Sequence, residues 1–203
     1  MTAETRAESY GEQGLSLVDR LGVWLSQRAI LPHVPPGARM LDLGCGYDAT
    51  LLRSLAPRLA AGTGVDVSIG DEARAVPGLR FEEGTLEEAF PRLDDASFEL
   101  VTLINVLEHL WEPQETLTAC HRVLAPGGVL LVNVPTWRGK IALELSAFRL
   151  GTSPAIEMDD HKAYYDGRDL WPLLVRAGFK PSAIRLRRHK LGLNLFAVAR
   201  RTA

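Results

Sequence analysis

The chain has 203 residues, of which 46% are hydrophobic, and a formal net charge of -2 at pH 7. This length suits one domain, and the composition excludes a predominantly disordered chain and a strongly basic surface for nucleic acid. Its two cysteines, Cys45 and Cys120, are too few for a disulfide framework or a zinc cluster. We therefore expect a single domain over residues 1–203 in a reducing, cytoplasmic setting.

The first 31 residues are expected to form an N-terminal helical segment. Leu17, Leu21 and Trp24 mark one face of a helix, and the prolines between residues 32 and 36 end it. This helix should pack on the sheet edge or over the mouth of a ligand site. The start of the chain has no apolar core behind a basic stretch, and no run reaches the length of a membrane span. Neither secretion nor a membrane span is expected.

Residues 38–50 organise the rest of the chain. Met40, Leu41 and Leu43 form an apolar run of strand length, and Gly44 and Gly46 then allow a sharp turn into a helix. A strand, a glycine turn and a helix N-terminus together predict a nucleotide-type cofactor site at the carboxyl end of a parallel sheet.

The remaining elements alternate between strand and helix patterns. Further strands are expected at residues 62–68, 79–82, 98–104 and 129–134, and helical patterns at 51–59, 69–76 and 113–124. Residues 136–165 form a variable segment, expected to bind the acceptor or act as a lid, with an amphipathic face of Ile141, Leu145 and Phe148. A helix at 170–177 ends at Gly178, and strands at 183–190 and 194–200 close the chain.

Two cofactor classes use such a glycine turn. Gly44, Gly46 and Ala49 fit the dinucleotide pattern, with Asp66 about twenty residues on. Asp42 favours the other class, because a carboxylate two residues before the first glycine would repel a pyrophosphate. A nicotinamide-dependent oxidoreductase stays open as the alternative.

Four ordered segments carry a resemblance to the class I S-adenosylmethionine-dependent methyltransferases, of the small-molecule, type 11-like kind. They are the acid and glycines at 42–46, the strand ending in Asp66, the Asn105-Val106-Leu107-Glu108-His109 segment, and the Leu124-Ala125-Pro126-Gly127-Gly128 turn. The resemblance implies a doubly wound, Rossmann-like α/β fold. Its seven-stranded sheet would be mostly parallel, with an antiparallel C-terminal strand hairpin and helices on both faces.

The resemblance also implies a site for S-adenosylmethionine, with S-adenosylhomocysteine as product. Asp66 would accept hydrogen bonds from the ribose hydroxyls, Thr85 stands where the family often has an acid for the adenine, and Asp48 stands where it commonly has a third glycine. The expected cofactor-binding residues are Asp42, Gly44, Cys45, Gly46, Asp66, Val67, Thr85, Leu86 and Asn105.

Transfer to a hydroxyl or an ammonium needs a general base, and histidine is the usual one near neutral pH. His161 and His109 are the rival candidates, with Tyr164 and Tyr165 as walls of the acceptor site. Some related O-methyltransferases place a metal beside an acid followed by Glu-His; because Asn105 replaces that acid, no metal is expected. A cofactor-binding module without turnover is a further alternative.

The dense basic run from Arg185 to Lys190 has no interleaved aromatic residues, so it is interpreted as a solvated strand edge. We therefore expect a small-molecule acceptor, no DNA partner and no RNA partner. The sequence leaves the acceptor atom and the oligomeric state open.

Overall fold

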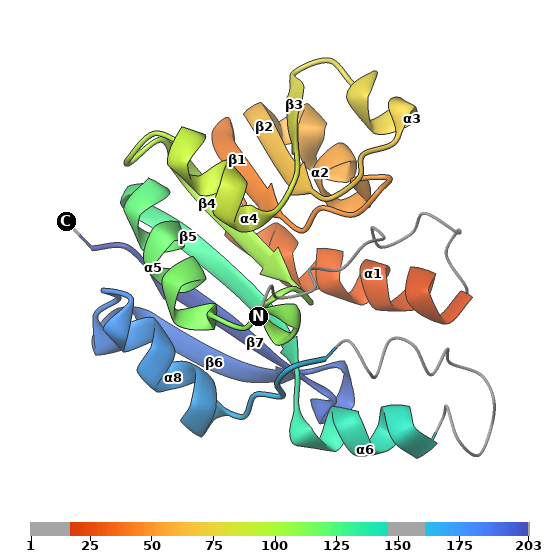
Figure 1. Cartoon of the computed structure of the whole chain (residues 1–203), viewed down its shortest axis with the longest axis vertical. Helices are drawn as coiled ribbons and strands as arrows, with labels where there is room; N and C mark the ends of the chain where they lie inside the picture. Colours follow the sequence, from red (N-terminus) through yellow and green to blue (C-terminus); the bar gives the residue numbers. More distant parts are fainter. Residues whose placement is uncertain (1–16, 146–160, 203) are drawn as a thin grey trace.

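A seven-stranded sheet runs through the molecule in the order β3-β2-β1-β4-β5-β7-β6 (Figure 1). The computed structural model describes residues 17–145 and 161–202. The strands are β1 (Ala38–Leu43), β2 (Leu59–Asp66), β3 (Leu79–Glu83), β4 (Phe98–Ile104), β5 (Leu124–Pro135), β6 (Ile184–His189) and β7 (Asn194–Arg200). The helices are α1 (Leu17–Ile30), α2 (Thr50–Leu55), α3 (Asp71–Arg74), α4 (Leu86–Ala89), α5 (Pro113–Val123), α6 (Trp137–Leu145) and α8 (Gly167–Arg176).

The first five strands pair in parallel, and the last two are antiparallel additions. β1 pairs with β2 and β4, β2 with β3, and β4 with β5. β7 pairs antiparallel with β5 and with β6, which leaves β6 at the edge of the sheet. The predicted fold class, including the C-terminal hairpin, is confirmed.

Helices cover both faces of this sheet because the parallel strands are connected by crossovers. On one face α4, α5 and α8 pack on residues such as Leu41, Leu103 and Val132. On the other face α1, α2 and α3 pack on Met40, Leu100 and Leu131. The successive residues Met40 and Leu41 thus face opposite cores, as the alternation of side chains along a strand requires.

One predicted helix ends earlier than its leucine spacing indicated. The 51–59 pattern places Leu59 on a helix, but α2 ends at Leu55 and Leu59 begins β2. A short 3₁₀ turn, Ala56–Arg58, separates the two elements. Pro57 explains the correction, because its ring has no N–H to continue the helical ladder.

Two parts of the sequence prediction are only partly covered by the structure. Of the amphipathic face expected after residue 136, Ile141 is exposed on α6, whereas Phe148 and the Leu145 side chain lie outside the described residues. Among the helices that the structure describes, none combines the length and the apolar character needed to cross a bilayer.

Candidate active site

The turn after β1 is fastened to the end of β2. Gly44 and Gly46 have φ of 68° and 78°, a left-handed conformation that glycine adopts without steric cost. The N–H groups of Gly44 and Cys45 both donate to the Val65 carbonyl, at 2.8 and 3.1 Å. A Cβ at Gly44 would lie 2.3 Å from Cγ2 of Val106, so this position also needs glycine for space.

Asp66 connects three strand ends. Its Oδ2 accepts the Gly46 N–H at 2.7 Å, and its Oδ1 accepts the N–H of Val67 at 2.9 Å. Its carbonyl accepts the N–H of Gly84, which follows β3, at 2.9 Å. The carboxylate therefore lies at the turn, half-buried, where a ligand resting on Gly46 would meet it.

Asp42 has a very different environment from Asp66. Its side chain is buried inside the sheet, and its Oδ1 accepts a hydrogen bond from the Thr102 hydroxyl of β4 at 2.5 Å. Burial raises the pKa of Asp42 to about 7, with the nearby Asp66 charge acting in the same direction and the Thr102 bond opposing. Burial likewise raises the pKa of the neighbouring Cys45 thiol, so this cysteine is no reactive thiolate.

Thr85 and Leu86 start the short helix α4. The Thr85 hydroxyl accepts the Glu88 N–H at 3.3 Å, and the Glu88 carboxylate accepts the Thr85 N–H at 3.0 Å. This reciprocal pair is a capping box. It fixes Thr85 beside the end of β3, with the Leu86 side chain buried against the core.

Asn105 follows β4 with φ of 56°, a conformation that asparagine tolerates better than most residues. Its Oδ1 accepts Nδ2 of the fully buried Asn133 at 2.7 Å and Nδ2 of Asn194 at 3.4 Å. Its backbone N–H donates to the Asn133 carbonyl at 2.8 Å. Sequence reasoning missed this amide cluster, because its members come from β4, β5 and β7.

The two histidines that the sequence offered as rival bases lie side by side. The rings of His109 and His161 meet edge to face, with centroids 4.9 Å apart. Nδ1 of His161 lies 3.1 Å from the Tyr164 hydroxyl. The two candidates thus belong to one site rather than to competing sites.

Backbone hydrogen bonds bring the His161 segment to this place. The N–H groups of Lys162 and Ala163 donate to the Glu108 carbonyl at 2.7 and 3.2 Å, and that of Tyr165 donates to the Pro135 carbonyl at 3.0 Å. Tyr165 itself is part of the core, donating to the Leu107 carbonyl at 3.3 Å, and burial raises its pKa to about 12. Of the two tyrosines expected as walls of the acceptor site, Tyr165 packs in the core and Tyr164 contacts His161.

Glu108, His109 and His161 also have the geometry of a small ligand set. One carboxylate oxygen and one ring nitrogen from each histidine lie within 4.8 Å of one another. Glu108 is buried and the histidines are half-buried. The sequence prediction of no metal did not foresee that His161 would come so close to the Glu-His pair.

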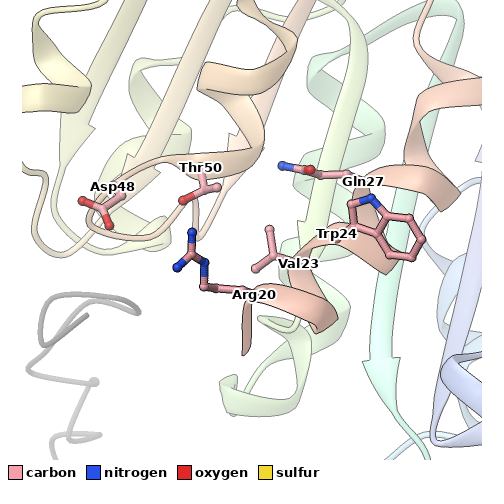
Figure 2. A pocket seen from close by; sticks show the side chains of 6 residues that line it. All are labelled: Arg20, Val23, Trp24, Gln27, Asp48 and Thr50. Atoms are coloured by element: carbon pink, nitrogen blue, oxygen red, sulfur yellow. The ribbon is translucent and has the colours of Figure 1, made fainter. Parts of the chain in front are cut away.

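A cavity of about 420 Å³ lies between the end of the glycine turn and α1. Its described lining is Arg20, Val23, Trp24, Gln27, Asp48 and Thr50. Figure 2 shows the Arg20 side chain reaching from α1 toward Asp48 and Thr50. Sequence reasoning expected this helix on the sheet edge or over the mouth of the site, and it did not single out Arg20. The four- and three-residue steps from Arg20 to Trp24 and Gln27, which place them on one helix face, were the available signal.

The predicted cofactor residues gather at the carboxyl ends of the first four strands. Asp42 lies within β1, below the turn; Gly44, Cys45 and Gly46 form the turn; and Asp66, Val67, Thr85, Leu86 and Asn105 follow the neighbouring strands. The pair His109 and His161 lies beyond Asn105, next to Glu108. The chain therefore offers a site for a nucleoside ligand with a polar, histidine-containing site beside it.

Comparison with known proteins agrees with this arrangement. A probable S-adenosylmethionine-dependent methyltransferase of Mycolicibacterium smegmatis is 35% identical over 120 residues, covering 52% of this chain and 41% of that protein. The ubiquinone biosynthesis O-methyltransferase of Pseudomonas aeruginosa is 33% identical over 119 residues, covering 54% of this chain and 48% of the relative. The alignments thus span somewhat under half the length of these curated relatives.

The fold has counterparts among solved structures, and a family model extends over most of the chain. The S-adenosylmethionine-dependent methyltransferase of Mesorhizobium loti superimposes with a TM-score of 0.66 at 21% identity, covering 88% of this chain and 97% of the other. The family model described as a methyltransferase domain matches residues 17–183. The chain therefore belongs to the methyltransferase domain family, within the class I, S-adenosylmethionine-dependent methyltransferases.

Proposed function

We propose that this protein transfers a methyl group from S-adenosylmethionine to a small-molecule acceptor. The observation that carries the proposal is the position of the Asp66 carboxylate, which accepts a hydrogen bond from the Gly46 N–H of the glycine turn. A carboxylate at this position can accept hydrogen bonds from the two hydroxyls of a ribose. The ligand of this family has no phosphate, so the Asp42 carboxylate below the turn is no obstacle.

The chain supplies partners for each part of the donor. Asp66 and Val67 would hold the ribose, and Thr85 and Leu86 would border the adenine. Gly44, Cys45 and Gly46 let the backbone approach the ligand closely, and Asn105 would border the methionine part. Arg20, in the cavity beside Asp48 and Thr50, is placed to bind a carboxylate. When bound, the donor supplies an electrophilic methyl group on a sulfonium.

The residues around the acceptor have to orient it, exclude water and take up a proton. In the proposed reaction the acceptor oxygen forms a bond to the methyl carbon as the carbon–sulfur bond breaks, and the acceptor's proton passes to an imidazole. His161, oriented by Tyr164, and His109, in contact with it, are the proposed bases. The imidazolium then releases its proton to water.

An oxygen acceptor on a partly apolar molecule is the proposed substrate class. Relatives such as the Pseudomonas aeruginosa protein are named as O-methyltransferases. The aromatic contacts from His109 to His161, Tyr164 and Trp137 form one continuous row that would suit a flat or apolar acceptor.

Titration calorimetry with S-adenosylhomocysteine and, separately, with NAD tests the donor site. We expect the nucleoside to bind and NAD not to bind. Asp66→Asn should weaken nucleoside binding by about 10- to 100-fold, because hydrogen bonds to a charged carboxylate are lost. Asp71→Asn, an exposed aspartate at the start of α3, is the matched control and should bind as the wild type does. NAD binding without nucleoside binding would instead establish the oxidoreductase alternative.

Turnover needs its own experiment, because binding alone fits a cofactor-binding module. With radiolabelled donor and a set of phenolic acceptors, His161→Gln and His109→Gln should lower the rate and leave nucleoside affinity unchanged. Equal rates in both variants and the wild type would show that neither histidine acts as the base. We further propose that the protein works in the cytoplasm; its two cysteines, Cys45 and Cys120, form no disulfide, which is usual in a reducing compartment.

A further inference from the structure

Large apolar side chains protrude from three elements at one end of the sheet. Leu191 of the turn η7 (Lys190–Gly192) is 100% exposed, Trp137 and Ile141 of α6 are 51% and 65% exposed, and Leu21 and Trp24 of α1 are 56% and 49% exposed. We call these five residues the apolar rim. Isolated exposed leucines are ordinary, whereas several large apolar residues on adjoining elements mark an interaction site.

The β6–β7 turn, which contains η7, contacts both α6 and α1. The Thr136 hydroxyl donates to the Gly192 carbonyl at 2.9 Å, and a Cβ at Gly139 would lie 2.3 Å from the Leu193 carbonyl oxygen, so α6 lies directly against the turn. The turn also approaches α1, because a Cβ placed on Gly22 would lie 3.6 Å from Nζ of Lys190. In Figure 1, α1 and α6 lie at the end of the sheet toward which β4 and β5 run.

Leu191 occupies a position of the tight β6–β7 hairpin turn whose backbone favours glycine. It is held at φ of 59°, next to Lys190 at φ of 47°, so two consecutive residues with side chains occupy the left-handed region. A fully exposed leucine gains no burial in return for this conformation. Strained positions of this kind concentrate at functional sites.

Positive charge accompanies the apolar rim. The elements that carry it, α1, α6 and residues 187–193, contain seven Lys or Arg residues and two Asp or Glu residues, in a chain of net charge -2. Arg138, Arg187 and Arg188 are exposed, the last two on opposite faces of β6, and the Arg28 guanidinium lies 5.1 Å above the Trp24 ring. Tryptophan and leucine interleaved with arginine and lysine are the composition of surfaces that rest on anionic lipid.

We infer that the apolar rim docks the protein peripherally on an anionic lipid bilayer, with the site mouth facing the lipid. The geometry favours lipid over a second copy of this chain, because a two-fold contact through this surface would bring its own arginines together. Leu191, Trp137, Ile141 and Leu21 protrude, which suits insertion into headgroups, and Trp24 also borders the cavity beside the glycine turn. The aromatic row from Trp137 to Tyr164, His161 and His109 would then lead from the lipid to the histidine pair.

Only the choice of acceptor rests on the proposed function, because a lipid-facing mouth would draw an amphiphilic acceptor from the bilayer. Docking itself is measured without any methyl donor, and donor binding by calorimetry is measured without lipid. Failure of one measurement therefore leaves the other intact.

Co-sedimentation with vesicles tests the inference. The full chain should bind phosphatidylcholine vesicles that contain about one third phosphatidylglycerol, and bind pure phosphatidylcholine much more weakly. Salt should weaken the binding, because it screens the attraction. Leu191→Gly should weaken partitioning about tenfold, the effect of keeping one leucine out of an apolar phase. Arg138→Gln and Arg188→Gln should each weaken it about fivefold.

Two features of this design separate docking from misfolding. Glycine suits the backbone at position 191, so Leu191→Gly should leave the melting temperature unchanged or higher. Trp171→Ala removes an exposed tryptophan from α8, outside the rim, and should bind vesicles as the wild type does. Wild-type protein that ignores anionic vesicles overturns the inference, as does Leu191→Gly binding with unchanged affinity. A concentration-dependent dimer that Leu191→Gly dissociates, without vesicle binding, assigns the surface to a second copy.

Discussion

Two aspartates at the heart of the site differ in their environment. Asp66 is half-buried and accepts hydrogen bonds from two backbone N–H groups. Asp42 is buried within the sheet, with the Thr102 hydroxyl as its side-chain partner. Asp66 is therefore suited to bind a ligand, and Asp42 makes the stability of the protein depend on pH.

The pKa of Asp42 predicts how stability depends on pH. In the unfolded chain an aspartate has a pKa of 3.8, and in the folded protein burial raises the Asp42 pKa to about 7. The folded state therefore binds this proton more tightly, and the contribution of Asp42 to stability is lost as pH rises from about 4 to about 7. Asp42→Asn removes this titration. Between pH 4 and pH 7 the free energy of unfolding of the variant should therefore rise relative to that of the wild type by roughly 2 to 4 kcal/mol.

Urea unfolding of both proteins at a series of pH values measures this difference. Asp71→Asn, whose carboxylate is exposed, is the control and should show no such trend. A wild-type-minus-variant difference that stays flat between pH 4 and pH 7 would show that folding does not raise the pKa of Asp42.

Single residues were predictable where local backbone chemistry demands them. Gly44 and Gly46 stand in a motif whose turn needs left-handed backbone, and the structure confirms that conformation. Asn133 was not predicted, because a buried asparagine inside an apolar strand has no local signature. Its role depends on Asn105, which lies on another strand, and such pairings arise only from the tertiary fold.

At the scale of elements, α6 is tied to the hairpin turn as one unit. The Thr136 hydroxyl caps the start of the helix by accepting the Gly139 N–H at 3.1 Å, while it donates to the turn at Gly192. Gly139 lies so close to the Leu193 carbonyl that any side chain at position 139 would clash with this backbone group. The start of the helix is thus fixed by contact with the β6–β7 turn.

This contact reverses the usual effect of replacing a helical glycine. Alanine normally stabilises a helix by about 0.5 to 1 kcal/mol relative to glycine. At Gly139 the new Cβ would lie 2.3 Å from the Leu193 oxygen, so Gly139→Ala should destabilise by about 1 to 3 kcal/mol. Gly22→Ala on α1 is the matched control, because among the described residues the new Cβ would meet the flexible end of Lys190 at an ordinary 3.6 Å.

Thermal unfolding distinguishes the two glycine variants. Gly139→Ala should lower the melting temperature by roughly 2 to 10 °C, and Gly22→Ala should leave it unchanged or raise it. Equal stabilisation in both variants would mean that α6 does not contact the turn as described.

The sequence predicted the order of elements better than their ends. Alternating apolar runs and leucine repeats indicated β1 to β5 with their helices, because strand and helix periods differ. The end of α2 was misplaced, since a leucine at helical spacing continued past Pro57 into β2. The contact of α6 with the turn has no sequence signal beyond Gly139 itself, because its partner is a backbone carbonyl.

At the scale of the whole molecule, one sheet separates two cores that are continuous along it. The core under α4, α5 and α8 runs from Val65 of β2 to Ala199 of β7, and the core under α1, α2 and α3 runs from Met40 of β1 to Phe196 of β7. β1 contributes to both. Disruption of either core therefore exposes strands of the other, which favours unfolding in a single step.

We accordingly expect the whole chain to unfold as one cooperative unit, and the donor product to stabilise all of it. In calorimetry a single transition should appear, with calorimetric and van't Hoff enthalpies equal. At about 100 times its dissociation constant, S-adenosylhomocysteine should add about 2.7 kcal/mol, a shift of roughly 5 to 11 °C in the entire transition. Asp66→Asn should lose most of that shift at the same ligand concentration. Two transitions, with only one moved by the ligand, would divide the chain into separate folding units, because a ligand held by β1, β2 and β4 stabilises only what unfolds with them.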